Sequence, residues 1–371
     1  MNHTRVDIIA GARPNFMKIA PIIRAIQIRQ ERGSRLRYRL VHTGQHYDAS
    51  MSGEFFSQLG IPEPDVNLGA GSGTQAEQAS AIMIGYERLL LDSPSGLCLV
   101  VGDVTSTMAC SISAQKLCVR VAHVEGGIRS GDWTMPEEIN RMVTDAIANY
   151  FFTTSHHANE NLRRSGVEDE RIFFVGNTMI DTLLANMQRL RPPAFCGALG
   201  LRPAEYFVVT LHRPANVDSL SHLQTTLAAI GDACRGLPVV FPVHPRTART
   251  LQKLPGTPAN INFVEAQPYL EFNYLVKHAK AVITDSGGIT EETTVMGVPC
   301  LTLRNTTERP ETVTVGTNEL IGTDPANLKP ALDRLFSGEW KKGGTPELWD
   351  GKTGERIVEV LERLLDASGR S

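Results

Sequence analysis

The chain has 371 residues, which is more than one hydrophobic core usually serves, so the length predicts about two domains. Its hydrophobic share of 42% and its charged share of 21% are ordinary for a globular protein. The 37 basic and 40 acidic residues leave a net charge of −3, which argues against a nucleic-acid partner or a membrane-binding surface. An anionic ligand would therefore need positive groups gathered locally.

The six cysteines are scattered without a CxxC pair, which predicts a reduced, cytoplasmic protein rather than a disulfide scaffold. The N-terminal stretch MNHTRVDIIAGARP lacks an apolar segment of signal-peptide length. No run of about 18 apolar residues occurs in the sequence, so we expect no transmembrane helix.

Short apolar runs separated by helical patterns fill the first half of the chain. The helical patterns include residues 18–30 and 136–148. Continuous apolar strands separated by helices predict a parallel sheet covered on both faces. The expected strands are Val6–Ala10, Tyr38–Thr43, Leu97–Gly102, Val119–Val124, Tyr150–Thr154 and Ile172–Gly176.

A Pro- and Gly-rich stretch, residues 189–206, interrupts this pattern and predicts a linker. The pattern then restarts, so we expect an α/β protein with two doubly wound Rossmann-like domains, 1–188 and 189–350. A helix within 351–371 is expected to pack back on the first domain. Ligands of such sheets bind beyond the carboxyl ends of the strands, which favours a site in an interdomain cleft. The expected strands of the second half are Tyr206–His212, Pro238–His244, Ile261–Ala266, Ala281–Ser286 and Pro299–Leu303.

Polar residues follow the first two expected strands. Arg13 and Lys18 surround a glycine turn at the start of a helix, where they either bind an anion or remain solvated cations. Gln45 and His46 follow the second strand and either contact a ligand or complete a local turn.

Three carboxylates stand near the ends of the next strands. Asp103 ends an apolar strand, where it either faces a ligand, which we favour, or caps the following helix. Glu125 closes a strand before two glycines, and no local structural role explains it. Glu137 begins a helix, where it suits the helix dipole and can pair with Arg141 four residues later.

The second half carries its polar cluster at the stretch TDSGGITEE, residues 284–292. Asp285 or Ser286 either caps the next helix or belongs to an anion site. In the second interpretation the two glycines let a phosphate approach backbone N–H groups, and Glu292 accepts hydrogen bonds from a ribose. His212 follows an earlier strand of the same half. No HExxH or other metal-ligand spacing occurs in the sequence, so neither zinc nor another cofactor is expected.

Taken in order, nine stretches resemble the non-hydrolysing UDP-N-acetylglucosamine 2-epimerase family. They run from Gly11 to Glu311, and nine motifs in register are far more specific than any one alone. The implied fold is the two-domain GT-B arrangement. The stretches are GARPNFMKIAPI, TGQH, VVGDVTSTMA, HVEGGIRSGD, PEEINR, VGNTMIDTL, TLHRP, TDSGGITEE and TTERPE. Ala12 and Asn15 depart from the GTRPE sequence that is common in the first motif.

The resemblance implies interconversion of UDP-GlcNAc and UDP-ManNAc by inversion at C2. The implied route is anti elimination of UDP to 2-acetamidoglucal, followed by re-addition of UDP. Relatives acting on UDP-diacetamido uronic acids, hydrolysing epimerases and GT-B glycosyltransferases are the alternatives. The resemblance also implies a homodimer that works in polysaccharide biosynthesis.

The resemblance assigns roles motif by motif. It makes Asp103, Glu125 and Glu137 the catalytic carboxylates, without settling which face of the sugar each one serves. It makes His212 the contact or acid for the leaving group. The residues that it assigns to the substrate and UDP are Arg13, Lys18, Gln45, His46, Arg141, Phe272, Ser286, Gly287, Gly288, Glu292 and Arg309.

Overall fold

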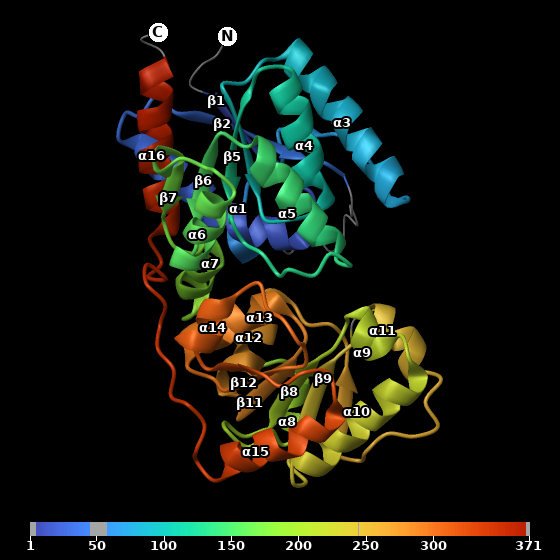
Figure 1. Ribbon diagram of the computed structural model, residues 1–371. Coiled ribbons are helices and arrows are strands. Elements are labelled where there is room, and N and C mark those ends of the chain that lie inside the picture. Colours follow the sequence, from blue (N-terminus) through green and yellow to red (C-terminus); the bar gives the residue numbers. More distant parts are fainter. Residues whose placement is uncertain (1–4, 45–57, 244, 369–371) are drawn as a thin grey trace. The chain divides into compact units, whose positions relative to one another are not determined.

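The structure is a computed structural model that describes residues 5–44, 58–243 and 245–368. The chain forms two compact units, one made of Met1–Ala185 with Glu347–Ser371 and the other of Asn186–Pro346 (Figure 1). The chain thus leaves the first unit and returns to it, and the second unit is an insertion within the first. None of the helices in the described ranges has both the length and the apolar character that a membrane crossing requires.

The first unit is built on a parallel sheet, whose strand order within the described residues is β3-β2-β1-β4-β5-β6-β7. The order reverses between β1 and β4, and such a switch point is where open α/β sheets bind ligands. The strands are β1 (Arg5–Ala10), β2 (Arg37–His42), β3 (Val66–Asn67), β4 (Leu97–Val101), β5 (Arg120–Val124), β6 (Tyr150–Thr153) and β7 (Ile172–Phe174).

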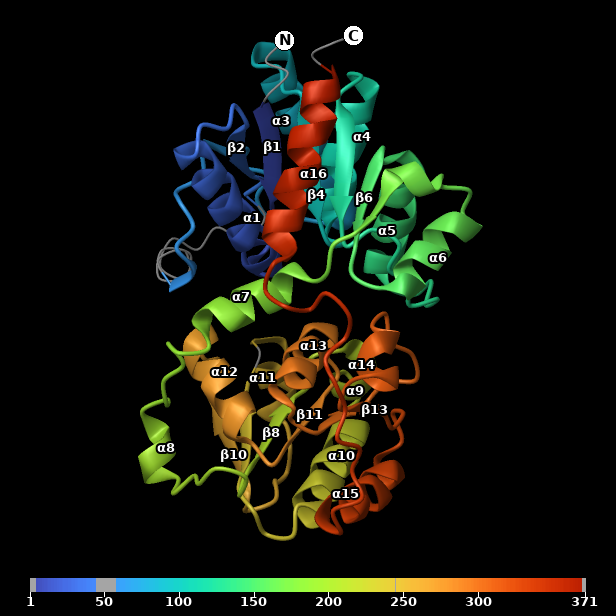
Figure 2. The same ribbon diagram turned by 90° about the vertical axis from the view of Figure 1, so that its left-hand side faces the viewer.

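Helices cover both faces of this sheet. On one face α3, α4 and α5 pack in series, and on the other α1 and α16 lie side by side (Figure 2). The backbone N–H of Gly354 donates to Asp181 at 2.7 Å, and a side chain there would meet the carbonyl oxygen of Pro21 at 2.6 Å. The helices are α1 (Arg13–Glu31), α3 (Gln75–Asp92), α4 (Thr105–Lys116), α5 (Pro136–Ile147), α6 (His156–Arg164), η1 (Asp169–Arg171), α7 (Thr178–Asn186) and α16 (Thr353–Ser368).

The second unit repeats the plan on a smaller scale. Its parallel sheet has the order β10-β9-β8-β11-β12-β13 within the described residues, again with a switch point, between β8 and β11. The strands are β8 (Phe207–Thr210), β9 (Val239–Pro242), β10 (Ile261–Val264), β11 (Ala281–Thr284), β12 (Cys300–Thr302) and β13 (Asn318–Leu320). The helices are α8 (Phe195–Ala198), α9 (Pro214–Val217), α10 (Leu220–Ala233), α11 (Pro245–Leu251), α12 (Tyr269–His278), α13 (Gly287–Met296), α14 (Pro310–Thr314), η2 (Pro325–Asn327) and α15 (Leu328–Phe336).

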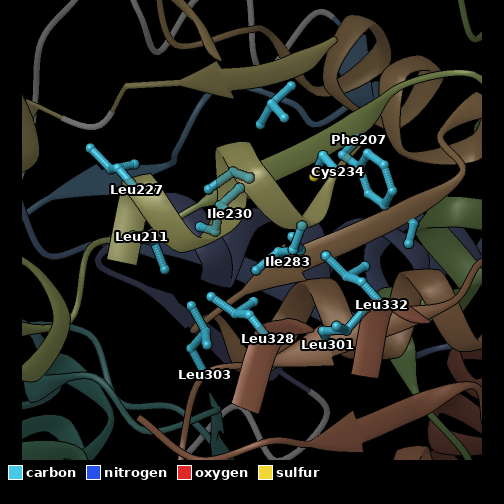
Figure 3. Close-up of a cluster of buried hydrophobic side chains, with 14 of the residues drawn as sticks. Phe207, Leu211, Leu227, Ile230, Cys234, Ile283, Leu301, Leu303, Leu328 and Leu332 are labelled. Atoms are coloured by element: carbon cyan, nitrogen blue, oxygen red, sulfur yellow. The ribbon is translucent and has the colours of Figure 1, made fainter. Parts of the chain in front are cut away.

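Apolar side chains from this sheet are buried on both of its faces. Figure 3 shows one face, where Ile283 of β11 faces Ile230 of α10 and Leu328 of α15. The other face packs against α12 and α13, as the burial of Leu275 and Val276 shows. Burying apolar surface on two faces is what the continuous apolar strand sequences require.

The predicted class, α/β with two Rossmann-like domains, is confirmed. The predicted strands are found, but several are shorter than expected at their carboxyl ends. The strands expected to reach His212 and Ser286 end at Thr210 and Thr284. There the backbone N–H groups turn away from the sheet: His212 donates to Asp285, and Ser286 donates to the hydroxyl of Thr284. Two short strands, β3 and β13, are absent from the prediction.

Candidate active site

Two of the expected catalytic carboxylates follow neighbouring strands of the first sheet. Val101 of β4 pairs with Val124 of β5, so Asp103 and Glu125 leave the sheet side by side at its carboxyl edge. The side chain of Asp103 is partly exposed, whereas that of Glu125 is buried. The parallel topology therefore brings these two groups together, as their places in the sequence predict.

Lys18 of α1 binds the buried carboxylate. Its ammonium lies 2.9 Å from Oε2 of Glu125, and both side chains are at least 90% buried. The same ammonium lies against Gly102, where an added Cβ would be 2.7 Å from Nζ. Removing one partner of such a buried ion pair strongly destabilises the folded protein, because the other charge stays buried without compensation. The family resemblance assigns Lys18 to the substrate and UDP, and the structure adds Glu125 as its partner within the same unit.

Asn15, one of the departures from the common motif, ties α1 to the sheet. Its side-chain oxygen accepts from the backbone N–H groups of Gly11 and Ala12 at 3.1 and 3.0 Å. Its amide donates to the carbonyl oxygen of Val101 at 3.0 Å. A glutamate could not make this last donation when ionised, so Asn15 joins the ends of β1 and β4 in a way particular to an amide.

Glu125 stands on a strained backbone. Its φ is +69°, a left-handed conformation that costs a non-glycine residue about 1–3 kcal/mol. The turn continues through Gly126 and Gly127, where a Cβ would collide with Phe151 and with the carbonyl oxygen of Ala158. The glycines are therefore required by close packing as well as by the turn.

The guanidinium of Arg141 on helix α5 joins two carboxylates. Nη1 of Arg141 lies 2.5 Å from Asp103, and Nε and Nη2 donate to Glu138 at 2.9 and 2.7 Å. The side chain is only 2% exposed. Asn140 of the same helix donates to the carbonyl oxygen of Asp103 at 2.8 Å. The helix thus fixes both the side chain and the main chain of Asp103.

The predicted pairing of Arg141 with Glu137 is wrong, because Arg141 binds Glu138 instead. Glu138 also accepts from the backbone N–H groups of Ser130 and Gly131. Burial tends to raise the pKa of Glu138, but the hydrogen bonds from Ser130 and Arg141 outweigh it and lower the pKa. Glu137 is exposed and makes no hydrogen bond or ion pair with any described residue.

A buried histidine connects the same helix to the strand ends. Nδ1 of His123 lies 2.7 Å from Asp145, and Nε2 lies 2.8 Å from the carbonyl oxygen of Gly102. Asp145 also accepts from the backbone N–H of Gly127 and from Arg129. Burial tends to raise the pKa of Asp145, but the charge and hydrogen bond of His123, together with Arg129, lower it. The network fixes the peptides next to Asp103 and Glu125.

In the second unit, His212 and Asp285 follow the neighbouring strands β8 and β11. Asp285 does not cap α13, which corrects the capping interpretation of TDSGGITEE; Ser286 holds the N-cap position and makes no side-chain cap. Asp285 instead accepts from the backbone N–H groups of His212 and Arg213 and from the amide of Asn216. The loop after β8 takes this carboxylate because the two strand ends are adjacent.

The N-terminus of α13 faces a cluster of opposite charges. A Cβ on Gly287 would collide with Glu308, whereas Gly288 has open space around it. Arg304 donates to Glu308 at 2.6 Å, and Arg213 lies 3.7 Å from it. Burial tends to raise the pKa of Glu308, but Arg304 and the other arginines outweigh it and lower the pKa to about 2. A carboxylate therefore occupies part of the space at this helix N-terminus.

Arg304 has one N–H donor group that can bind an anion. Its side chain is only 7% exposed, and its Nη1 has no hydrogen-bond partner among the described residues. This Nη1 lies 3.8 Å from the position that a Cβ on Gly287 would take. A guanidinium beside a helix N-terminus is well suited to phosphate oxygens.

The remaining residues assigned to the nucleotide lie around α12 and α13. Glu292 is buried and accepts from Asn273 at 3.3 Å. Burial raises its pKa to about 7, with the charge of Glu291 adding to the rise. Arg309 lies 2.5 Å from Glu291, and Phe272 is partly buried on α12.

Three of the expected site residues receive no side-chain description. Gln45 and His46 lie outside the described residues. The backbone of Arg13 begins α1, and its side chain also lies outside the description.

The sequence interpretation misses a polar stripe on α5. Glu138, Arg141 and Asp145 are spaced by three and four residues, so they lie on one side of the helix. All three are buried, which is unusual for charged residues unless they are paired. This spacing of charged residues could have identified Glu138 and Asp145 from the sequence. Across the described residues, no group of three or more His, Cys, Asp or Glu side chains has the arrangement of a metal site.

Two Rossmann-like units, one with paired carboxylates at its strand ends and one with arginines at a helix N-terminus, are the parts of a GT-B enzyme of nucleotide-sugar chemistry. A sequence profile of the UDP-N-acetylglucosamine 2-epimerase family matches residues 28–362. The chain belongs to this family. It is therefore an epimerase, in the isomerase class of enzymes.

Individual relatives match over nearly their whole lengths. The UDP-N-acetylglucosamine 2-epimerase of Methanocaldococcus jannaschii is 39% identical, with 96% of this chain and 98% of that protein covered. The UDP-2,3-diacetamido-2,3-dideoxy-D-glucuronate 2-epimerase of Pseudomonas aeruginosa is also 39% identical, with 96% and 99% covered. The crystal structure of the M. jannaschii enzyme in complex with UDP-GlcNAc and UDP has a TM-score of 0.87 at 38% identity, covering 97% of this chain and 99% of that one.

Proposed function

We propose that this epimerase inverts C2 of a UDP-N-acetylhexosamine and interconverts UDP-GlcNAc and UDP-ManNAc. The observation that carries the proposal is the pair Asp103 and Glu125, held by cations at adjacent strand ends. Inversion at a carbon that bears hydrogen needs a proton acceptor and a proton donor on opposite faces, hence more than one carboxylate. The UDP-GlcNAc complex of the M. jannaschii relative supports the choice of substrate.

In the proposed route a carboxylate removes the C2 proton while the bond between C1 and the UDP oxygen breaks. The electron pair of the C2–H bond forms the C1–C2 double bond of 2-acetamidoglucal, and the oxygen of UDP keeps the electron pair of the broken bond. UDP then adds back to C1, and C2 takes a proton on its opposite face. No oxidant or reductant is consumed, and the sum is an isomerisation.

The residues of the second unit are proposed to hold UDP. The N-terminus of α13, with Ser286, the amides of Gly287 and Gly288, and the spare donor of Arg304, would stabilise the departing diphosphate. Arg13 and Lys18 are assigned to the same diphosphate. Because the structure shows Lys18 bound to Glu125, we propose that Lys18 acts chiefly on that carboxylate.

The other assigned residues complete the proposed site. Glu292 would hold the ribose, and Phe272 and Arg309 would lie near the nucleotide. Glu137, which is exposed, would join the two paired carboxylates in proton transfer. Arg141 would act by holding Asp103 rather than by touching the sugar.

The same chemistry on a UDP-diacetamido uronic acid is the second candidate. Its support is the P. aeruginosa relative, which is as similar to this chain as the M. jannaschii enzyme. Assays with both substrates in D₂O separate the candidates, because the true substrate is converted and gains deuterium at C2. Steady release of UDP without the epimeric nucleotide sugar would instead indicate a hydrolysing enzyme, and a need for an acceptor would indicate a glycosyltransferase. Conversion without deuterium at C2 would exclude the elimination route.

Variants of the carboxylates test the site. Asp103→Asn, Glu125→Gln and Glu137→Gln should each lower kcat by about 10²-fold or more, the usual scale for lost acid–base catalysis. Glu87→Gln, at an exposed position on α3, is the matched control and should keep full activity. Near-normal turnover in all three site variants would end the assignment.

We also propose, from the family resemblance, that the enzyme is a cytoplasmic homodimer that supplies sugars for polysaccharide biosynthesis. All six cysteines are free thiols, which suits a reducing compartment. Sedimentation of the purified protein as a monomer would contradict the dimer.

A further inference from the structure

His212 and Asp285 form a carboxylate–histidine pair at the ends of β8 and β11. Nδ1 of His212 lies 2.8 Å from Oδ1 of Asp285. The carboxylate is fully buried, whereas 41% of the histidine side chain is exposed. The pair therefore has one anchored partner and one partner that a ligand can reach.

Asp285 is fixed by more than the histidine. It accepts from the backbone N–H groups of His212 and Arg213 at 3.1 and 2.9 Å, and from the amide of Asn216 at 3.0 Å. Burial tends to raise its pKa, but the hydrogen bond and charge of His212, with Asn216 and Arg213, lower it. The carboxyl group is thus ionised and has no proton to donate. Its contact with Nδ1 therefore requires that Nδ1 carry the hydrogen.

This geometry sets the tautomer of the ring. When Nδ1 carries the hydrogen of a neutral imidazole, Nε2 is the acceptor, and Nε2 gains the second proton in the imidazolium. An ionised carboxylate at Nδ1 also stabilises the imidazolium, as in other histidine–carboxylate pairs of enzymes.

We propose that Asp285 is a positioning residue that makes Nε2 of His212 the proton-exchanging atom toward the departing diphosphate. This role rests on the function proposed above. When the C1–O bond breaks, the oxygen keeps the electron pair, and the Nε2–H of the imidazolium donates to it. In the re-addition the proton returns to Nε2 as the C1–O bond forms. Asp285 itself exchanges no proton in either direction.

The alternative is that Asp285 serves only to cap the turn at α9. Asp285→Asn keeps an oxygen acceptor of the same size for the backbone N–H groups but removes the charge. If Asp285 acts through His212, this variant should lower kcat by about 10²-fold while changing KM by less than about threefold. Unchanged kcat in this variant would overturn the proposal.

A double-variant comparison tests whether the two residues act as one unit. The loss in Asp285→Asn combined with His212→Asn should equal the loss in His212→Asn alone, since Asp285 would have no ring left to position. Losses that multiply would show that Asp285 acts independently, against the proposal. Asn216→Ala is the matched control, because it removes a hydrogen bond from Asp285 without touching the ring. It should lower thermal stability and leave kcat nearly unchanged.

A measurement on the resting protein separates this inference from the proposed function. Nitrogen NMR of ¹⁵N-histidine-labelled protein should show the Nδ1–H tautomer for the neutral ring of His212, and Asp285→Asn should reduce its population. An Nε2–H tautomer in the wild-type protein would overturn the inference even if UDP-sugars are epimerised. The Nδ1–H tautomer in a protein that converts no UDP-sugar would support the positioning contact and refute only the proposed function.

Discussion

Replacing the buried carboxyl group of Glu292 by an amide should remove a pH dependence from the stability of the second unit. Burial raises the pKa of Glu292 to about 7 in the folded chain, against an ordinary value of 4.5. The folded state therefore holds the proton more tightly than the unfolded state does. This contribution to stability is complete below about pH 4.5, declines as the pH rises and is lost above about pH 7.

The size of the effect follows from the two pKa values. They differ by about 2.5, and one pKa unit corresponds to about 1.36 kcal/mol, so the wild-type protein should lose about 3 kcal/mol between acidic and alkaline pH. Glu292→Gln keeps the shape of the protonated acid and can still accept from Asn273. The variant should therefore gain about 3 kcal/mol relative to the wild-type protein, mostly between pH 5 and pH 8.

Hydrogen exchange with mass spectrometry measures this gain on peptides from β11 and α13, which report on the second unit alone. Wild-type and variant proteins are compared at equal pH, so the intrinsic exchange rates cancel. Glu265→Gln, at an exposed position of the same unit, is the control and should show no trend with pH. A stability difference between Glu292→Gln and the wild-type protein that stays constant from pH 5 to pH 8 would refute the reasoning.

Three further changes test individual contacts. Arg141→Lys should destabilise the first unit by about 1–3 kcal/mol in urea unfolding, because a lysine cannot bridge Glu138 and Asp103; unchanged stability would contradict the bridge. Glu308→Gln should strengthen UDP binding about tenfold in calorimetry, because it removes a negative charge from the N-terminus of α13; equal or weaker binding would argue against a diphosphate there. Gly127→Ala should cost about 2 kcal/mol or more in thermal unfolding, because its φ is +81° and a Cβ would collide with the backbone of α6; a melting temperature equal to that of the wild-type protein would oppose this.

The apolar runs were enough to predict most strands and the parallel class, because a sheet buried on both faces leaves a continuous apolar sequence. The same signal fails for β13, whose sequence Asn-Glu-Leu is short and mostly polar, and for β3, which has two residues. The strand β8 was predicted to reach His212 because Leu211 is apolar. Leu211 is buried, but it lies beyond the end of β8 at Thr210. Its neighbour His212 turns its N–H toward Asp285, a tertiary contact that no local pattern reveals.

In the candidate site, too, some features follow from the sequence and others depend on tertiary contacts. Asp103 and Glu125 could be placed together from sequence, since parallel strands end at one edge of the sheet. The partner of Arg141 could not be predicted from sequence, because both Glu137 and Glu138 lie within reach of Arg141 on a helix. The choice depends on which side of α5 faces the protein, and the burial of Glu138 settles it.

Because the chain returns to the first unit after the second, the last part of the first unit is synthesised after the whole of the second unit. Every residue of the second unit leaves the ribosome before α16 does, and α16 packs against α1. Until then α1 lacks the helix that packs beside it in the complete first unit, whereas the second unit has its whole sequence available. Because domains tend to fold as units during synthesis, the inserted unit can fold before the first unit is complete. A released chain truncated before Thr353 would therefore carry the complete second unit and an α1 without its α16 neighbour.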